Sequence, residues 1–192
     1  KSLKLQGSIR SKVASNTYKK KEGKGVIVFN QPILEIENET FRRFTGLQEM
    51  ILPEGVTSIG DWAFDHCTGL QEIVIPSSVT SIGDGTFRGC TGLQEVVIPE
   101  GVTEIGQYAF CNCTALHDVV IPEGVTSIGE HAFYRCESLK SITIPASVTK
   151  FEYSDNLYLT TDIATLNMGC SYLNGSVFCS SFNGCTSLES IV

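Results

Sequence analysis

Residues 76–98 read PSSVTSIGDGTFRGCTGLQEVVI, and this 23-residue pattern recurs along the middle of the chain. Four consecutive copies begin at Pro53, Pro76, Pro99 and Pro122, and Pro145 opens a further one. A fixed period of this length is typical of a solenoid, in which each repeat forms one coil and buries its apolar side only by stacking on its neighbours. The repeat therefore predicts a stack of similar coils instead of one globular core.

Five positions of the repeat hold the same residue type in all four copies. In the second copy these positions are Val79, Ile82, Phe87, Cys90 and Leu93. A stacked core requires such uniformity, because each buried side chain packs on its own counterpart in the next coil. The two residues after each phenylalanine share no chemistry, and we expect all of these pairs, Cys111 included, to face water: Asp65-His66, Arg88-Gly89, Cys111-Asn112 and Tyr134-Arg135.

The end of each repeat has the alternation of a half-buried strand. It places Ile73 and Ile75 inward, with Glu72 and Val74 outward. Pro76 then ends the strand, because proline lacks the N–H that a ladder needs. Val79 to Ile82 predicts a second, shorter strand on the opposite side, and Gly83 a turn with unusual dihedral angles. We expect parallel strands in one curved sheet at 27–29, 50–52, 73–75, 96–98, 119–121, 142–144, 166–168 and 190–192.

The complete motif is Pro-x-x-Val-x-x-Ile-Gly-x-x-Ala-Phe-x-x-Cys-x-x-Leu-x-x-Ile-x-Ile, which resembles the BspA-like (Treponema-type) leucine-rich repeat. The match is specific in four copies and recognisable over residues 26–192. The resemblance implies a leucine-rich-repeat solenoid of the α/β horseshoe class, mostly β with little helix, and with its parallel sheet on the concave face. It also implies a secreted or cell-surface protein that acts in adhesion or in binding host proteins, and it offers no catalytic residues.

The chain divides into two parts by charge and pattern. Residues 1–25 hold eight Lys and Arg and one acid, a net +7, and the remainder holds six basic and 20 acidic residues, a net −14. We interpret residues 1–25 as an N-terminal β cap over the exposed end of the core; a basic arm for anionic surfaces is the alternative. This segment has no apolar run and is not a signal peptide. The acidic remainder argues against nucleic-acid binding.

Residues 26–192 are predicted to form about seven coils of about 23 residues. The coils are regular over 53–144 and irregular over 145–192, where each core position still finds a counterpart after one or two added residues. Val148 and Phe151 stand for the Val and Ile of the motif, and Leu166 and Met168 fall on the strand. No stretch is long enough to span a membrane, and we expect no membrane insertion.

The eight cysteines do not predict a metal site. Five of them occupy one core position and are expected to be reduced and buried, because a free cysteine behaves as a small apolar residue: Cys67, Cys90, Cys113, Cys136 and Cys185. Zinc sites usually use ligands a few residues apart, whereas these are one coil apart. Cys170 and Cys179 lie in the irregular coils, where a disulfide between them and two free thiols both stay open.

No constellation of catalytic residues is apparent. His66, His117 and His131 fall at different repeat positions on different coils, without a paired nucleophile, and are interpreted as solvated surface residues. We therefore predict a protein that is not an enzyme and needs no cofactor or metal.

Two outward columns of the sheet are candidates for binding a partner. One is acidic and consists of Glu49, Glu72, Glu95 and Asp118. The other is β-branched and mostly apolar, with Ile51, Val74, Val97, Val120 and Thr143. A continuous exposed apolar row often marks an interface. The alternatives are a solvated negative stripe, a calcium site, and a simple preference of strands for β-branched residues.

The irregular coils offer a competing surface. Residues 153–183 are rich in Tyr, Ser, Asn and Gly, the composition of adaptable binding loops and also of ordinary irregular ones. The tyrosines singled out are Tyr153, Tyr158 and Tyr172. From these features we predict a non-enzymatic module that binds a host or matrix protein. A structural spacer in a larger surface protein, and a targeting module for a separate catalytic domain, remain alternatives.

Overall fold

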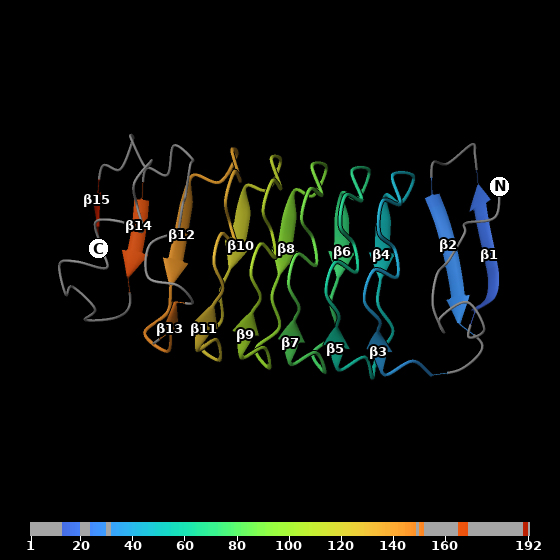
Figure 1. Cartoon of the computed structure of the whole chain (residues 1–192), viewed down its shortest axis with the longest axis horizontal. Helices are drawn as coiled ribbons and strands as arrows, with labels where there is room; N and C mark the ends of the chain where they lie inside the picture. The colour runs from blue at the N-terminus through green and yellow to red at the C-terminus, as the bar shows by residue number, and fades with distance from the viewer. Residues whose placement is uncertain are drawn as a thin grey trace.

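The computed structural model describes residues 13–19, 24–29, 32–148, 150–151, 165–168 and 190–191. The described residues form strands and turns and contain no helix. Successive circuits of the chain stack along one axis to make a solenoid, with the N-terminal strands at one end (Figure 1). The predicted fold class is confirmed. The four regular coils lie whole within the described residues, so fewer coils are seen in full than the seven expected.

One side of the solenoid, which we call the strand face, carries strands of three or four residues and, at its C-terminal end, the two-residue β15. They are β4 (Glu49–Ile51), β6 (Glu72–Val74), β8 (Glu95–Val97), β10 (Asp118–Val120), β12 (Ser141–Ile144), β14 (Thr165–Met168) and β15 (Ser190–Ile191). Paired strands are parallel, with partners one repeat apart, as Met50 with Ile73. The prediction of one continuous sheet is wrong, because hydrogen-bonded pairing joins β4 to β6, β8 to β10, and β12 to β14 to β15.

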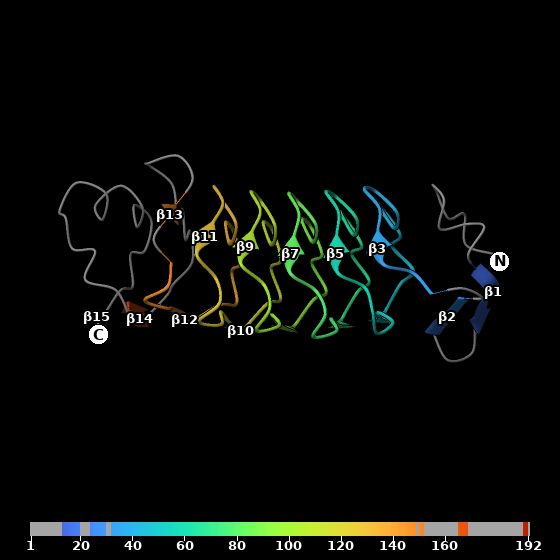
Figure 2. The same ribbon diagram turned by 90° about the horizontal axis from the view of Figure 1, so that it is seen from below.

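The opposite side carries a continuous sheet of short strands. They are β3 (Glu35–Ile36), β5 (Ser58–Ile59), β7 (Ser81–Ile82), β9 (Glu104–Ile105), β11 (Ser127–Ile128) and β13 (Lys150–Phe151). All six pair in parallel and in chain order. In Figure 2, β10 and β12 lie along one side of the solenoid and β5, β7 and β9 along the other. The second strand expected from Val79 to Ile82 is therefore present.

Each short strand leads into a turn that bonds to the next coil. The N–H of Trp62 donates to the carbonyl of Asp84 in the next coil at 2.7 Å, whereas the N–H of Ala63 donates within its own coil, to Gly60 at 3.3 Å. The amides thus alternate between a carbonyl of the next coil and a carbonyl of their own coil. This alternation requires left-handed backbone at two positions, and both Trp62 and His66 have φ of 57°. The turn thus satisfies its amides without forming a helix.

The core between the two sides is built from stacked identical residues. The rings of Phe41, Phe64, Phe87, Phe110 and Phe133 form one continuous stack, with centroids 5.0–5.4 Å apart. All five are among the largest fully buried side chains. Stacked aromatic pairs at such separations contribute about 0.5–1.5 kcal/mol beyond the area they bury. The stack therefore ties each coil to the next along the full length of the regular region.

The cysteine column is buried and hydrogen-bonded. Each thiol donates to the carbonyl of the phenylalanine one coil earlier, as Cys67 to Phe41 at 3.0 Å and Cys90 to Phe64 at 3.1 Å. The same Phe64 carbonyl also accepts the N–H of Cys67. Burial raises the pKa of Cys67 to about 12 and the pKa of Cys90 well above its ordinary value. The four cysteines that the structure describes in this column are free and buried, as the sequence predicted.

The positions expected to face water on the turn are not all exposed. Cys111 is only 4% exposed, and desolvation raises the pKa of its thiol. Asp65 is 1% exposed, where it accepts from Arg42 Nε at 3.0 Å and contacts His66 Nδ1 at 2.7 Å. The prediction that these positions face water is wrong for these two residues and for Gly89, which is also buried. Their column varies in chemistry because each side chain meets a different neighbour on the adjacent coil.

The first two strands form a hairpin. β1 (Val13–Lys19) and β2 (Lys24–Phe29) pair antiparallel, with Tyr18 opposite Gly25. The returning strand at 26–29 is confirmed, but the assignment of 27–29 to the parallel sheet is wrong, because β1 and β2 form a separate two-stranded sheet. The division into a cap, residues 1–25, and a solenoid, residues 26–192, stays a prediction.

The strands predicted for the irregular coils are present. Phe151 pairs with Ile128 in the short-strand sheet, and Leu166 pairs with Ile142 on the strand face. Leu166 pairs in turn with Ile191. These registers confirm the counterparts read from the sequence. Residues 152–164 and 169–189, with Cys170, Cys179 and Cys185, lie outside the described residues.

One glycine column has a different role from the one predicted. Gly60, Gly83, Gly106 and Gly129 do not have left-handed φ angles. A Cβ on Gly106 would instead lie 2.6 Å from the carbonyl carbon of Gly83 and 2.7 Å from the nitrogen of Asp84. Glycine is required here because consecutive coils approach backbone to backbone, so the expectation of unusual dihedral angles is wrong.

We predict that Gly106→Ala lowers the free energy of unfolding by about 1–3 kcal/mol, because the added methyl group overpacks a backbone contact. Denaturant unfolding measures this change. Gly46→Ala is the matched control, since a Cβ there meets nothing within 4 Å, and it should be neutral or stabilising by up to about 1 kcal/mol. Equal effects of the two substitutions would contradict the assigned role.

We predict that Cys67, Cys90, Cys111, Cys113 and Cys136 all resist alkylation in the native protein, because all are buried. Mass spectrometry after timed labelling, with and without denaturant, measures the protection. Fast labelling of Cys111 alone would restore the original surface assignment.

The raised thiol pKa values also predict alkaline sensitivity. The folded state keeps Cys67 protonated up to about pH 12, whereas the unfolded chain ionises it near 9.0. Its contribution to stability is therefore complete below pH 9 and is lost progressively as pH rises toward 12. Thermal unfolding between pH 8 and 11 is the measurement, and Cys67→Ala should flatten the decline.

Candidate partner-binding surface

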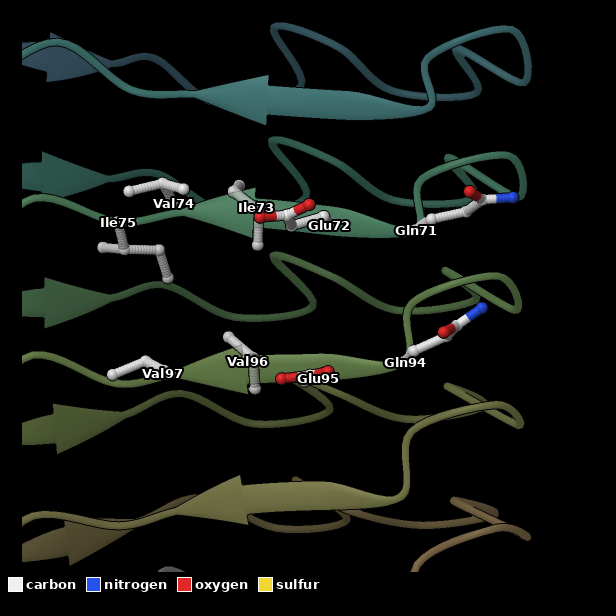
Figure 3. Close-up of a pocket in the computed structure, with 9 residues that line it drawn as sticks. All are labelled: Gln71, Glu72, Ile73, Val74, Ile75, Gln94, Glu95, Val96 and Val97. Carbon is white, nitrogen blue, oxygen red and sulfur yellow. The ribbon is translucent and has the colours of Figure 1, made fainter.

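The strand face presents aliphatic side chains to solvent in a row. Ile51 is 64% exposed, Val74 45%, Val97 72% and Val120 67%. The central residue of each three-residue strand points inward: it is buried in β4, β6 and β8, as Ile73 and Val96, and partly buried in β10, as Val119. Figure 3 shows Val74 and Val97 lying one above the other on neighbouring coils. The outward assignment of the apolar column is thus confirmed.

The acidic column runs beside the aliphatic one. Glu49 pairs in register with Glu72, and Glu95 with Asp118. Glu72, Glu95 and Asp118 are exposed, and Glu49 is partly so. Like charges placed directly opposite each other on neighbouring strands repel. Thr143, at the end of the aliphatic column, is exposed and pairs in register with Asn167.

An open groove of about 490 Å³ lies between β6 and β8. Its lining combines both columns with the edge of the core: Gln71, Glu72, Ile73, Val74, Ile75, Gln94, Glu95, Val96 and Val97 (Figure 3). The groove coincides with the interruption in strand pairing. At this interruption the backbone hydrogen bond from the Gln94 N–H to the Gln71 carbonyl has a donor–acceptor distance of 3.3 Å. The equivalent hydrogen bond one coil later, from the His117 N–H to the Gln94 carbonyl, is shorter, at 2.9 Å.

The chemistry of the strand face changes along the solenoid. Beyond the groove, His117 Nδ1 lies 3.0 Å from Asp118 Oδ2, so an imidazole takes the place of a glutamine beside the acidic column. On the next coil Lys140 and Ser141 follow. The negative charge is therefore concentrated over β4 to β10 and ends at β12.

The third group of predicted site residues is not placed. Tyr153, Tyr158 and Tyr172 lie outside the described residues. Within the residues that are described, no group of three or more His, Cys, Asp or Glu is arranged to hold a metal ion. The same part of the chain contains no helix that is long and apolar enough to cross a membrane.

The sequence analysis missed a second cluster, on the turns. The guanidinium carbon of Arg88 lies 5.3 Å from the centre of the Trp62 ring. The rings of Tyr108 and His131 stack at 5.0 Å, and Tyr134 meets His131 edge-on at 5.2 Å. The side chain of His131 is only 16% exposed, so its interpretation as a solvated histidine is wrong. The one available signal was that aromatic and arginine residues recur on these turns.

Comparison with known families identifies the class of protein. The family model for the BspA type leucine rich repeat region, with six copies, matches residues 11–117, 34–158 and 103–192. The chain belongs to this family. The repeat motif, the stacked phenylalanines and the parallel strand face agree with that assignment.

Solved structures show the same fold at low sequence identity. The leucine rich repeat protein of T. pallidum is 24% identical, with a TM-score of 0.63 over 98% of this chain and 83% of that one. A leucine rich cell surface protein of Faecalibacterium prausnitzii is 23% identical, with a TM-score of 0.54 over 100% of this chain and 55% of that one. The pneumococcal vaccine antigen PcpA is 20% identical, with a TM-score of 0.61 over 83% of this chain and 41% of that one.

No curated protein matches the chain. The structural relatives establish the fold, and the family is one of repeat scaffolds suited to protein interaction or a place at the surface.

We predict that Glu95→Gln raises the free energy of unfolding by about 0.2–1 kcal/mol at low salt, because it removes a like charge opposite Asp118. The gain should shrink at high salt, where the repulsion is screened. Chemical denaturation at two ionic strengths is the measurement. Glu104→Gln serves as control, since the register partners of Glu104 are Ser81 and Ser127. An equal gain in the free energy of unfolding for Glu104→Gln would contradict repulsion between Glu95 and Asp118 as the cause.

Proposed function

We propose that this protein is a non-enzymatic binding module that engages another protein through the strand face. The observation that carries the proposal is the row of four aliphatic side chains, 45–72% exposed, directly beside a row of carboxylates. Exposed apolar residues in a continuous patch mark interaction sites more often than scattered ones do. The columns lie on paired strands, so a partner meets a surface that is ordered before binding.

The chemistry of the face selects the partner. Carboxylates at Glu72, Glu95 and Asp118 favour a surface that carries Lys or Arg, and the aliphatic row favours apolar side chains at its centre. The groove between β6 and β8 offers both kinds of contact in one place. We infer a basic partner with an aliphatic or aromatic anchor.

A role in adhesion to a host or matrix protein is part of the same proposal, as is a secreted or cell-surface location. The family assignment supports both, and the similar protein of Faecalibacterium prausnitzii is described as a cell surface protein.

The test is a binding isotherm against a panel of purified extracellular-matrix and host-surface proteins. For a partner found in this way, Glu72→Lys with Glu95→Lys should weaken binding about tenfold or more and reduce its salt dependence. Val97→Asp should weaken binding at every salt concentration, because it places a charge in the aliphatic row. Both variants should remain folded, since these side chains point outward.

Two controls sharpen the result. Glu35→Lys with Glu104→Lys reverses the same number of charges on the other sheet and should leave binding unchanged. The combined substitution of Tyr153, Tyr158 and Tyr172 by Ala tests the irregular coils. Loss of binding in the tyrosine variant, with binding kept in the strand-face variants, would assign the function to residues 153–183 and refute the proposal.

A further inference from the structure

The aliphatic row of the strand face repeats with the spacing of the coils. Ile51 pairs in register with Val74, and Val97 with Val120, so each member lies one coil from the next. In the core below, the stacked phenylalanine rings lie 5.0–5.4 Å apart from coil to coil. The three coil steps from Ile51 to Val120 therefore span about 15 Å along the solenoid axis.

This spacing matches one turn of an α-helix. A helix that lies along the solenoid axis rises about 5.4 Å per turn, so it brings one side chain to each coil. An extended segment in the same direction repeats its same-side residues only about every 6.7 Å. Over three coil steps the helix falls out of step with the row by about 1 Å, and the extended segment by about 4–5 Å. A helix can therefore contact all four aliphatic side chains at once.

The width of the surface also suits one helix. In a strand such as β6 only Glu72 and Val74 point outward, and Figure 3 shows the same pair of columns continuing to Glu95 and Val97. The two columns are about 7 Å apart, two residues along the strand. A helix with its side chains is about 10–12 Å wide and covers both columns. A packed sheet would instead bring its apolar face onto the carboxylates, and burial of an unpaired charge is costly.

The carboxylates beside the aliphatic row determine the charge of the partner. Within the described residues Glu72 and Glu95 make no ion pair, and Asp118 contacts only the imidazole of His117. The strand segments 48–51, 71–74, 94–97 and 117–120 contain no Lys or Arg. A second copy of this chain would place carboxylates against carboxylates. A helix with Lys or Arg along the flank over the acidic column is complementary to it.

The groove between β6 and β8 lies at the midpoint of the row. It is open, has a volume of about 490 Å³ and separates Val74 from Val97, the two middle members (Figure 3). The strands on its two sides are not joined by backbone pairing, which leaves space for a larger side chain from the central turn of a helix. The contacts that dominate binding gather near the centre of an interface, in such pockets.

We propose that the partner of the strand face presents a basic amphipathic α-helix, an inference that rests on the function proposed above. The helix lies along the solenoid axis over β4, β6, β8 and β10, and about three turns cover this length. Its apolar residues, at spacings of three and four, contact the aliphatic row, and a bulky one at the centre enters the groove. Its Lys and Arg residues face Glu72, Glu95 and Asp118.

The test uses the whole chain and three fluorescent peptides of about four helical turns. The helical peptide places Leu, with one central Phe, at spacings of three and four and Lys along one flank. A hydrocarbon staple on its far side holds the helix, because short isolated helices are marginal in water. The alternating peptide has the same residues with apolar and polar positions alternating, as in a strand. The glutamate peptide is the helical one with Glu in place of each Lys.

Fluorescence anisotropy at physiological salt should show that the helical peptide binds about tenfold or more tightly than the alternating peptide, and that the glutamate peptide does not bind. Val97→Thr, which keeps the shape of the side chain, should weaken binding of the helical peptide about three- to tenfold, because a hydroxyl group enters the apolar contact. Glu72→Lys with Glu95→Lys should weaken it about tenfold or more. Glu35→Lys with Glu104→Lys, on the other sheet, should leave it unchanged.

The outcomes separate this proposal from the proposed function. Equal or tighter binding of the alternating peptide, weakened by the same strand-face variants, overturns the helix and leaves the strand face as the binding surface. Absence of binding by the helical peptide, or binding that neither strand-face variant weakens, also overturns the helix. In that case the isotherms against the panel of purified proteins still decide the proposed function by themselves.

Discussion

The constraint on which this structure depends is the contact of each coil with the coil 23 residues away. Backbone groups on the short-strand side and on the turns form hydrogen bonds with the neighbouring coil. In the core, the phenylalanine rings stack on those of the neighbouring coil and the cysteine thiols donate to its carbonyl groups. Because one coil alone cannot bury its apolar side, stability arises between neighbours. An inward residue must therefore suit its counterpart above and below, and this requirement keeps the inward positions uniform.

The same contact gives the surface its linear character. An outward-pointing side chain has a counterpart one strand spacing further along, on the next coil. A residue type that the repeat keeps at an outward position therefore forms a column on the surface. The aliphatic and acidic columns of the strand face arise in this way. Such columns create patches larger than isolated residues could form, and the rigid backbone below them lowers the ordering cost of binding. The interruption of strand pairing between β6 and β8 adds a groove to this surface.

The two sides of the solenoid differ because their backbones differ. On the strand face, alternation sends every second side chain outward. On the turns, left-handed residues place Trp62 and Tyr108 where they meet the next coil, and arginines pack onto the rings. One chain thus carries an acidic, aliphatic face and a side of turns where aromatic rings and guanidinium groups pack together, both supported by a single core.

The sequence by itself determined the period, the fold class, the inward residues and both columns of the strand face, because a repeat displays its own core as unchanging positions. Even in the irregular coils, the strand-pairing registers of Phe151 and Leu166 followed from the spacing of the motif. Only the tertiary structure decided which variable positions are buried. Asp65, Cys111 and His131 varied like surface residues, yet each meets a different neighbour on an adjacent coil: Arg42, Arg88 and Tyr108 respectively. It also decided the break beside β6 and the backbone contact at Gly106, since both depend on distances between coils that no single repeat encodes.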